Sequence, residues 1–330
     1  MMSAIDIFVR LGQRLRSFGH DEASLRAINR AVAENGWFSA HEALFAVEAI
    51  RSQMLIRAKL EAWLQTVPAT PSQQKRVAIV MAGNIPLAGF FDLLCVLICG
   101  HRAIVKPSGK DSALIHYIIT LLRDIEPETP VEETDDAGLY ASAPDAVIAT
   151  GGDNAMRLFR YRFGGIPLLL RGSRHSVAVL DGRETNEERC GLLSDISLYS
   201  GLGCRNVSMM FVPRGMKLRL SASSVNVKLR NNYLQTKAML TMRGAPFTDV
   251  GGLLLVPSME FPSALSTVSL AVYDDMEEVR EWLASHDSEL QCVVTHCIDH
   301  PRAVPFGAAQ RPRLNDYPDG MNVPEFLASL

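Results

Sequence analysis

The spacing of apolar and polar positions changes along the chain and divides it into a helical part and a mixed part. Residues 3–66 repeat apolar side chains at helical intervals, beginning with Ile5 and Phe8, and the run over 43–64 contains neither proline nor glycine. This part is predicted to be a helical N-terminal segment. The proline-containing stretch 68–71 ends the pattern, and shorter apolar runs follow it.

Short apolar runs then alternate with helical stretches. The predicted strands lie at 77–81, 103–105, 146–149, 177–180, 209–212, 253–256, 267–272 and 291–295. Helices are predicted at 85–100, 111–123 with Asp111 as cap, after Asp153, at 184–199, 218–242 and 275–286 with Asp275 as cap. Continuous apolar strands that alternate with helices are typical of parallel sheets buried on both faces. The expected fold class is therefore α/β, with two parallel-sheet blocks.

Composition and charge narrow the function classes. A chain of 330 residues is about two domains long, and 48% hydrophobic with 21% charged residues is ordinary globular composition. Lysine and arginine total 33 against 36 acidic residues, so the basic surplus of a phosphate-binding nucleic-acid protein is absent. Nucleic acid is not an expected partner.

No signal peptide or membrane span is expected. Residues 1–15 include Asp6 and Arg10, and the most apolar stretch, 85–100, contains Asp92 and is shorter than the ~20 residues of a spanning helix. Six cysteines without a signal peptide indicate free thiols in a reducing cytoplasm; they are Cys95, Cys99, Cys190, Cys204, Cys292 and Cys297.

Loops rich in glycine, asparagine, serine and lysine follow the predicted strands. Ligands of open parallel sheets bind at the carboxyl ends of the strands, so we expect a ligand at these loops. The dinucleotide fingerprint G-x-G-x-x-G does not follow the first strand. A nucleotide, if bound, must be held in another way.

Cys204 is the first candidate for chemistry. It lies in the turn Gly-Leu-Gly-Cys-Arg-Asn, where the glycines allow a ligand to approach the backbone. The cation of Arg205 and nearby backbone N–H groups would favour the thiolate, which is the form that attacks carbonyl carbons. The alternative is that Cys204 is a small buried residue of the core.

Other cysteines and histidines have simpler explanations. Cys95 and Cys99 lie four residues apart on an apolar helix, which indicates core packing. A second group could be drawn as a metal cluster, but its spacing matches no structural zinc pattern, and packing with a surface turn is the favoured interpretation; the group is Cys292, His296, Cys297 and His300.

His101 and His175 are the histidines nearest the predicted strand ends. Either could be a general base, although a surface or loop role is the more ordinary one. No carboxylate pair is spaced for glycoside hydrolysis, and no G-x-S-x-G elbow occurs.

Four ordered segments resemble the aldehyde dehydrogenase superfamily. GNIP at 83–86 resembles its N-F/Y-P turn, GHRAIVKPS at 100–108 its strand and K-P loop, Thr150-Gly151 its F-T-G-S element, and GLGC at 201–204 its G-Q-x-C nucleophile loop. The tail QRPRLNDYPDG at 310–320 is more specific and is similar to the LuxC-type acyl-CoA reductases. The resemblance covers roughly residues 75–330.

The resemblance implies a fold and site residues. It implies an aldehyde-dehydrogenase-like fold with a cofactor domain at 1–182, a catalytic domain at 183–303 and a tail at 304–330 that returns to the cofactor domain. Cys204 would be the acyl-accepting nucleophile, and the Asn84 side chain would donate to the oxyanion together with the Cys204 backbone N–H.

The resemblance also implies cofactor contacts. Lys106, within the K-P loop that continues to Ser108, would contact the adenosine ribose, and Gly151 with Gly152 would let the pyrophosphate and nicotinamide pass close to the backbone. Glu260 is the expected partner of the nicotinamide ribose.

Two departures from the superfamily change the expected reaction. The segment 169–176, LLRGSRHS, lacks the glutamate that activates water in hydrolytic members, so a thioester on Cys204 should resist hydrolysis and exchange with a thiol such as coenzyme A. Gly109 and Lys110 stand where an acidic residue usually holds the ribose 2′-hydroxyl, which favours NADPH over NADH, with NADH as the alternative.

The resulting hypothesis is NADPH-dependent reduction of an acyl-CoA, expected to be fatty, to an aldehyde. The alternatives are a thiol acyltransferase or acyl-binding protein that does not use nicotinamide, an oxidising semialdehyde-type dehydrogenase, and an inactive scaffold. A homo-oligomer and an acyl-activating partner enzyme are the expected associations.

Overall fold

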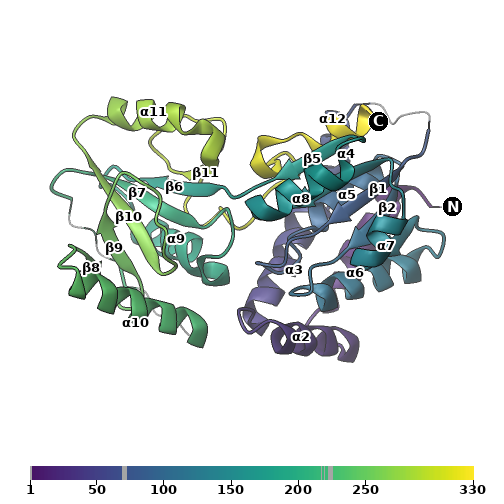
Figure 1. Cartoon of the computed structure of the whole chain (residues 1–330), viewed down its shortest axis with the longest axis horizontal. Helices are drawn as coiled ribbons and strands as arrows, with labels where there is room; N and C mark the ends of the chain where they lie inside the picture. Colours follow the sequence, from purple (N-terminus) through teal and green to yellow (C-terminus); the bar gives the residue numbers. More distant parts are fainter. Residues whose placement is uncertain (1, 69–72, 217, 219, 222–225) are drawn as a thin grey trace. The chain divides into compact units, whose positions relative to one another are not determined.

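The computed structural model describes residues 2–68, 73–216, 218, 220–221 and 226–330. The chain forms two compact units, each built on its own sheet (Figure 1). The first unit comprises Met1–Ser173 and Pro312–Leu330, and the second comprises Arg174–Arg311. The predicted breaker stretch at 68–71 falls mostly outside the described residues.

Four helices open the first unit: α1 (Ala4–Arg14), α2 (Glu22–Glu34), α3 (Ala40–Met54) and α4 (Arg57–Leu64). Local caps fix where they begin. The side chain of Ser3 accepts from the N–H of Asp6, and Ser39 forms a capping box with Glu42. The long run predicted over 43–64 is two helices, because the backbone leaves the helical conformation after Met54.

The first sheet is parallel, with strand order β3-β2-β1-β4-β5. Its strands are β1 (Arg76–Val80), β2 (Arg102–Lys106), β3 (Val131–Glu133), β4 (Ala146–Thr150) and β5 (Leu168–Arg171). The helices between them are α5 (Phe90–Ile98), α6 (Ser112–Ile125), α7 (Asp136–Ala141) and α8 (Asp153–Phe163). This confirms the α/β alternation expected from the sequence.

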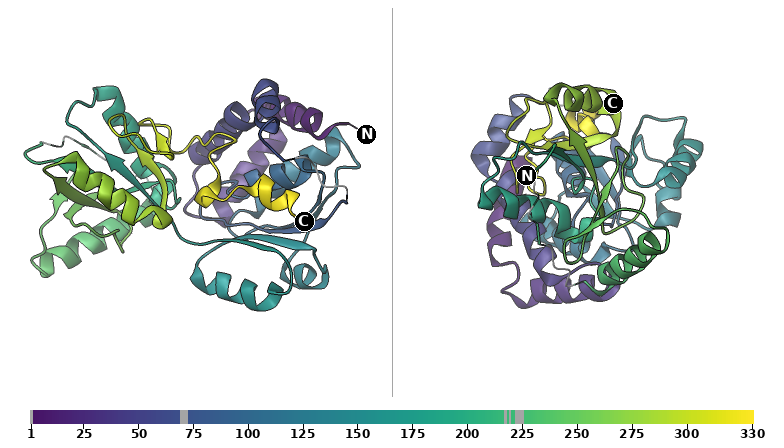
Figure 2. Two further views of the ribbon diagram at one scale, coloured as in Figure 1. Left: turned by 90° about the horizontal axis from the view of Figure 1, so that it is seen from above. Right: turned by 90° about the vertical axis from the view of Figure 1, so that its left-hand side faces the viewer.

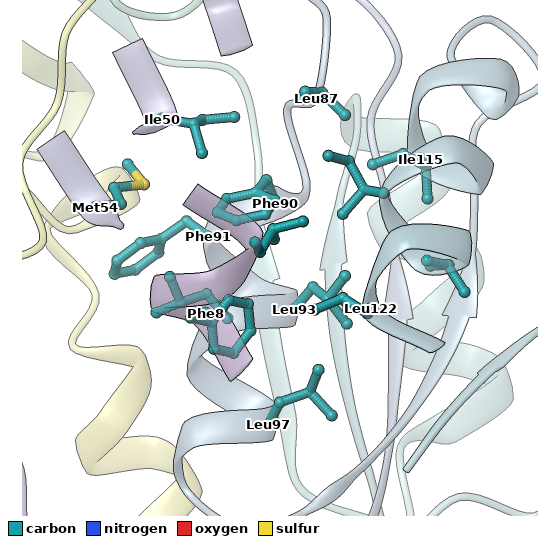
Figure 3. Close-up of a cluster of buried hydrophobic side chains, with 14 of the residues drawn as sticks. Phe8, Ile50, Met54, Leu87, Phe90, Phe91, Leu93, Leu97, Ile115 and Leu122 are labelled. Atoms are coloured by element: carbon teal, nitrogen blue, oxygen red, sulfur yellow. The ribbon is translucent and has the colours of Figure 1, made fainter. Parts of the chain in front are cut away.

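Alternate residues of β1 enter two different cores, which explains its continuous apolar sequence. Val77 and Ile79 join the core that contains Phe8, Phe90 and residues of α6 (Figure 3). Ala78 and Val80 join a second core on the other face, under α8.

The second sheet has the order β12-β11-β6-β7-β10-β9-β8 and is parallel except for β8. Its strands are β6 (His175–Val179), β7 (Val207–Pro213), β8 (Thr248–Asp249), β9 (Leu254–Pro257), β10 (Thr267–Tyr273), β11 (Leu290–Val294) and β12 (Ala303–Val304). Its helices are α9 (Asn186–Ser197), α10 (Val227–Met242) and α11 (Met276–Ser285), the last capped by Asp275 as predicted.

The C-terminal segment belongs to the first unit, so both chain ends lie there (Figure 2). Helix α12 (Val323–Ala328) packs against α5. The units divide after Ser173 and after Arg311, whereas the sequence analysis places its boundaries after 182 and 303. Strand pairing accounts for the difference, because β6 pairs with β7 and β11, and β12 pairs with β11.

Some predicted elements differ from the structure. The helix expected from residue 85 begins at Phe90, because a turn with Leu87 at φ +58° precedes it. The helix expected from 218 begins at Val227 among the described residues, and 219 and 222–225 lie outside them. Strands β3, β5, β8 and β12 were not predicted, and all four lie at the edges of their sheets. Strands β3, β8 and β12 are only two or three residues long, whereas the apolar run of β5 was not assigned to a strand. Among the described residues, no helix has the length and apolar character to cross a membrane.

Candidate functional site

Cys204 lies on a constrained loop between α9 and β7. A short 3₁₀ segment, Leu198–Gly201, precedes it, and Tyr199, Ser200 and Gly201 all have positive φ, at 55°, 56° and 72°. Left-handed backbone is costly at residues other than glycine, so the surroundings must impose this conformation.

Asn206 supplies much of that constraint. Its buried Nδ2 donates to the carbonyls of Asp195 (3.0 Å), Ile196 (3.2 Å) and Leu198 (2.8 Å). Its Oδ1 accepts the N–H of Gly203 at 2.8 Å. One side chain thus ties the end of α9 to the residue before Cys204. Asn206 is part of the Gly-rich turn singled out in the sequence, but its anchoring role is visible only in the structure.

The Cys204 side chain is half-buried at the amino end of β7. Its Sγ lies 3.8 Å from Oε1 of Gln291, at the start of β11, and its carbonyl accepts from Oγ of Ser176 at 2.9 Å. Strands β6 and β11 therefore both contact the loop of Cys204. The thiol is neither in a core cluster nor fully exposed.

Arg205 makes a hydrogen bond within the second unit. Its Nε donates to the carbonyl of Ala309 at 2.6 Å. The buried Asp195 carboxylate accepts the N–H groups of Gly307 (2.6 Å) and Ala309 (3.1 Å). Burial raises the pKa of Asp195 to about 6. The segment around Ala309 is thereby fixed against the Cys204 loop.

Three other candidate residues, Cys95, Cys99 and His101, are buried and have structural roles. Cys95 and Cys99 are buried in the first core, as predicted, and burial raises the pKa of both thiols. His101 is fully buried: Nδ1 accepts from the N–H of Lys75, and Nε2 lies 3.1 Å from the carbonyl of Leu327. These two backbone partners make His101 a structural link to α12 rather than a base.

His175 begins β6 and is half-buried. Its ring stacks on Phe261 with centroids 4.1 Å apart, and Nδ1 lies 3.3 Å from Oγ of Ser208. Burial lowers its pKa, so the neutral imidazole is favoured.

The candidate residues of the first unit lie on loops at the carboxyl ends of three adjacent strands. Asn84 is exposed on the turn after β1, and Ser108 to Lys110 follow β2. A Cβ at Gly83 would lie 2.4 Å from Oγ of Ser108, so only glycine permits this close approach of the two loops.

Asn35 holds these two loops together. It ends α2 and is buried, and its Nδ2 donates to the carbonyls of Gly83 (3.3 Å) and Lys110 (3.2 Å). Asn35 could not be predicted from the sequence, because it lies in the helical N-terminal segment, far along the chain from both loops.

Asp111 is the N-cap residue of α6, as predicted, but its side chain makes no capping hydrogen bond. Its buried carboxylate accepts the N–H of Leu87 at 2.6 Å, and the structure gives α6 no side-chain cap. Burial raises the pKa of Asp111 well above its usual range. Asp111 therefore supports the strained turn that contains Asn84.

The other predicted cofactor residues of the first unit lie at the ends of β2 and β4. Lys106, at the end of β2, pairs with Asp136 at 3.1 Å. A Cβ at Gly109 or Gly152 would meet no atom within 4 Å, whereas one at Gly151 would touch α8. Gly152 is the N-cap residue of α8, in place of the predicted Asp153.

Glu260 lies in the second unit, on the exposed loop between β9 and β10. Its carbonyl accepts from Oγ of Ser269 at 2.6 Å. The structure therefore brings six predicted cofactor residues to one sheet edge of the first unit, and it places Glu260 and Cys204 in the other unit.

The segment that lacks the hydrolytic glutamate has a structural role. Arg171, at the end of β5, is buried and pairs with Asp92 of α5, with Nη1 3.0 Å from Oδ2. The Arg171 guanidinium thus points into the first unit. The segment 169–176 contains no acidic residue.

Comparison with solved structures supports the fold. The chain matches a putative aldehyde dehydrogenase from Burkholderia cenocepacia with a TM-score of 0.67 and 14% identity, covering 91% of this chain and 76% of that one. It matches aldehyde dehydrogenase 21 from Physcomitrella patens with a TM-score of 0.67 and 12% identity, covering 96% and 81%. The aldehyde-dehydrogenase-like fold is confirmed.

Curated relatives match a shorter region. A long-chain acyl-protein thioester reductase of Aliivibrio fischeri is 24% identical over 148 residues, and one of Vibrio harveyi is 28% identical over 143 residues. These alignments cover 40% and 39% of this chain and 31% and 30% of the relatives. The chain thus matches less than a third of the length of these relatives.

The family model described as acyl-CoA reductase (LuxC) matches residues 47–235, which is more than half of the chain. The matched range contains both the turn of Asn84 and the loop of Cys204. The chain therefore belongs to the LuxC acyl-CoA reductase family.

Proposed function

We propose that this protein reduces an acyl thioester, with a fatty acyl-CoA as the expected donor, to the aldehyde through an acyl group carried on Cys204. The observation that carries the proposal is the Cys204 loop: a half-buried thiol on a strained turn fixed by Asn206. Family membership and the activity for which the long-chain relatives are named support an acyl thioester as substrate.

Cys204 would act as the nucleophile. Its thiolate attacks the thioester carbonyl, a new C–S bond forms, and the leaving thiolate takes up a proton as the original C–S bond breaks. Because the segment 169–176 has no carboxylate to activate water, the enzyme-bound thioester persists for reduction.

Asn84 is the proposed side-chain donor to the oxyanion, with the backbone N–H of Cys204 as its partner. Support for Asn84 comes from the GNIP turn, whose position Asn35 and Asp111 fix. A rigid donor is effective because it need not reorganise as charge develops.

The first unit and its C-terminal segment are proposed to bind the cofactor, and the second unit to carry the catalytic cysteine. The residues of the first unit suit a dinucleotide, because open space faces Gly109 and Gly152 at the carboxyl edge of the sheet and Gly152 leads into α8. Lys106 would meet the adenosine ribose, and Ser108 and Gly151 would line the same edge.

NADPH is the proposed cofactor, since Lys110 is exposed beside Gly109 and can meet a 2′-phosphate. Glu260 is the proposed contact of the nicotinamide ribose. The nicotinamide, when bound, supplies the hydride that brings the acyl carbon to the aldehyde level.

We further propose a cytoplasmic site of action, supported by six cysteines that are all reduced thiols. A homo-oligomer and an acyl-activating partner enzyme remain proposals that rest on the resemblance.

The test is a panel of acyl-CoAs of increasing chain length with NADPH or NADH. The proposal expects acyl-dependent loss of reduced nicotinamide with trapped aldehyde, a higher kcat/KM for NADPH, and loss of that preference in Lys110→Glu but not in the control Lys228→Glu. Acylation of Cys204 without nicotinamide oxidation would identify an acyltransferase. Faster oxidation of aldehydes by NADP⁺ would identify an oxidising dehydrogenase.

A further inference from the structure

Three side chains of different chemistry meet at one end of the second sheet. Asp181 follows β6 by two residues, and His296 and Cys297 follow β11, the parallel neighbour of β6. One ligand atom of each residue lies within 4.8 Å of the other two. We propose that Asp181, His296 and Cys297 bind a divalent transition-metal ion, with zinc as the best match.

The orientation of His296 suits metal binding. Its Nδ1 lies 2.7 Å from Oε1 of Glu188, in the first turn of α9, and its Nε2 lies 3.1 Å from Oδ1 of Asp181. Metal-bound histidines commonly donate the N–H of the other ring nitrogen to a carboxylate. Glu188 therefore holds Nδ1–H and directs the Nε2 lone pair toward Asp181 and Cys297.

Cys297 provides the ligand that favours zinc over magnesium or calcium. Its Sγ is half-buried and lies 3.3 Å from Oγ1 of Thr295. One sulfur, one imidazole nitrogen and one carboxylate oxygen, with water in the fourth position, form a tetrahedral set that zinc accepts. On binding, the Cys297 thiol and the Nε2–H of a protonated His296 release their protons to solvent.

The other members of the cluster considered in the sequence are directed elsewhere. Cys292 is buried, with its Sγ 3.1 Å from Oγ of Ser176. His300 faces Asp287 at 4.0 Å. The group of side chains that meet in the structure therefore contains Asp181 and lacks Cys292 and His300. The spacing of residues in the sequence does not connect Asp181 to His296.

A second arrangement of the same atoms is an imidazolium bridging two carboxylates. His296 pairs with both Asp181 and Glu188, and Arg183 lies 3.2 Å from Oδ2 of Asp181. Carboxylates alone would complete such a bridge, whereas the metal site requires Cys297. Substitution of Cys297 therefore separates the two.

A bound ion would link three segments. Asp181 follows β6, His296 and Cys297 follow β11, and Glu188 lies in the first turn of α9, whose other end leads to the Cys204 loop. The ion would stabilise the second unit rather than touch the acyl group.

The test is titration of the full chain with Co²⁺, which absorbs in the near ultraviolet through thiolate-to-metal charge transfer when a cysteine binds it. The host carries Cys190→Ser and Cys204→Ser, so that the exposed and the nucleophilic thiol cannot respond. We expect one equivalent of Co²⁺ to bind with the charge-transfer band, and Zn²⁺ to displace it and raise the melting temperature.

Variants assign the band. Cys297→Ser should abolish it, His296→Gln and Asp181→Asn should each weaken binding at least tenfold, and the control His300→Gln should leave binding unchanged. Melting curves without metal verify that each variant is folded. If one of the three ligand variants does not fold, the other two still test the site. No stoichiometric binding by the host, or a charge-transfer band that persists in Cys297→Ser, would overturn the proposal.

Discussion

Replacing Asn206 with alanine should destabilise the second unit and slow acylation of Cys204. The change removes the two N–H donors of Nδ2, which three carbonyls share, and the acceptor Oδ1, which amounts to three hydrogen bonds at a buried side chain. At about 1 kcal/mol for each bond, the expected loss is about 3 kcal/mol. A domain of this size loses about 2–4 °C per kcal/mol, so its melting temperature should fall by about 6–12 °C.

The matched control is Asn232→Ala, which removes one hydrogen bond from an exposed site on α10 and should cost no more than about 0.5 kcal/mol. The assay pairs differential scanning calorimetry with single-turnover acylation below the melting transition. If Asn206→Ala melts like Asn232→Ala, or acylates Cys204 at the wild-type rate, Asn206 does not position the nucleophile.

Three further results are expected. Burial raises the pKa of Asp195 from 3.8 to about 6, so the folded state binds the proton more tightly, and the contribution of Asp195 to stability should fall by about 2 kcal/mol as pH rises from about 4 to about 6. Asp195→Asn should flatten that decline in a melting series; an unchanged slope would contradict the buried carboxylate. Asp92→Asn leaves the buried Arg171 without its carboxylate and should lower the free energy of unfolding by about 3–5 kcal/mol. A loss below about 1 kcal/mol would contradict a buried ion pair. Asn84→Ala should lower kcat by about 10²–10³ with little change in KM; a stability loss with unchanged activity per folded molecule would make Asn84 structural.

The central strands could be predicted from the sequence because a strand buried on both faces must be apolar at every position. β1 is apolar at every position from Val77 to Val80, and both of its faces are buried. The edge strand β3 was missed because only its first residue, Val131, is buried. Hydrophobic pattern thus reports burial, and it fails where burial is partial.

The candidate site divides in the same way. Cys204 could be found from its turn, since glycine spacing is local. Asn35 could not, because its partners Gly83 and Lys110 are distant along the chain. The local rule placed Asp111 correctly at the start of α6, but it could not show that the carboxylate accepts the N–H of Leu87. Local chemistry can be predicted from sequence, but the contacts that hold it in place come from the fold.

The most direct test of the central claim is intact-mass analysis after incubation with a fatty acyl-CoA and no reduced nicotinamide. The account predicts one added acyl group, mapped to Cys204 by peptide analysis, stable in water, removed as aldehyde when NADPH is added, and absent from Cys204→Ala. An acyl adduct of equal yield on Cys204→Ala, or an adduct that NADPH does not release, would contradict it.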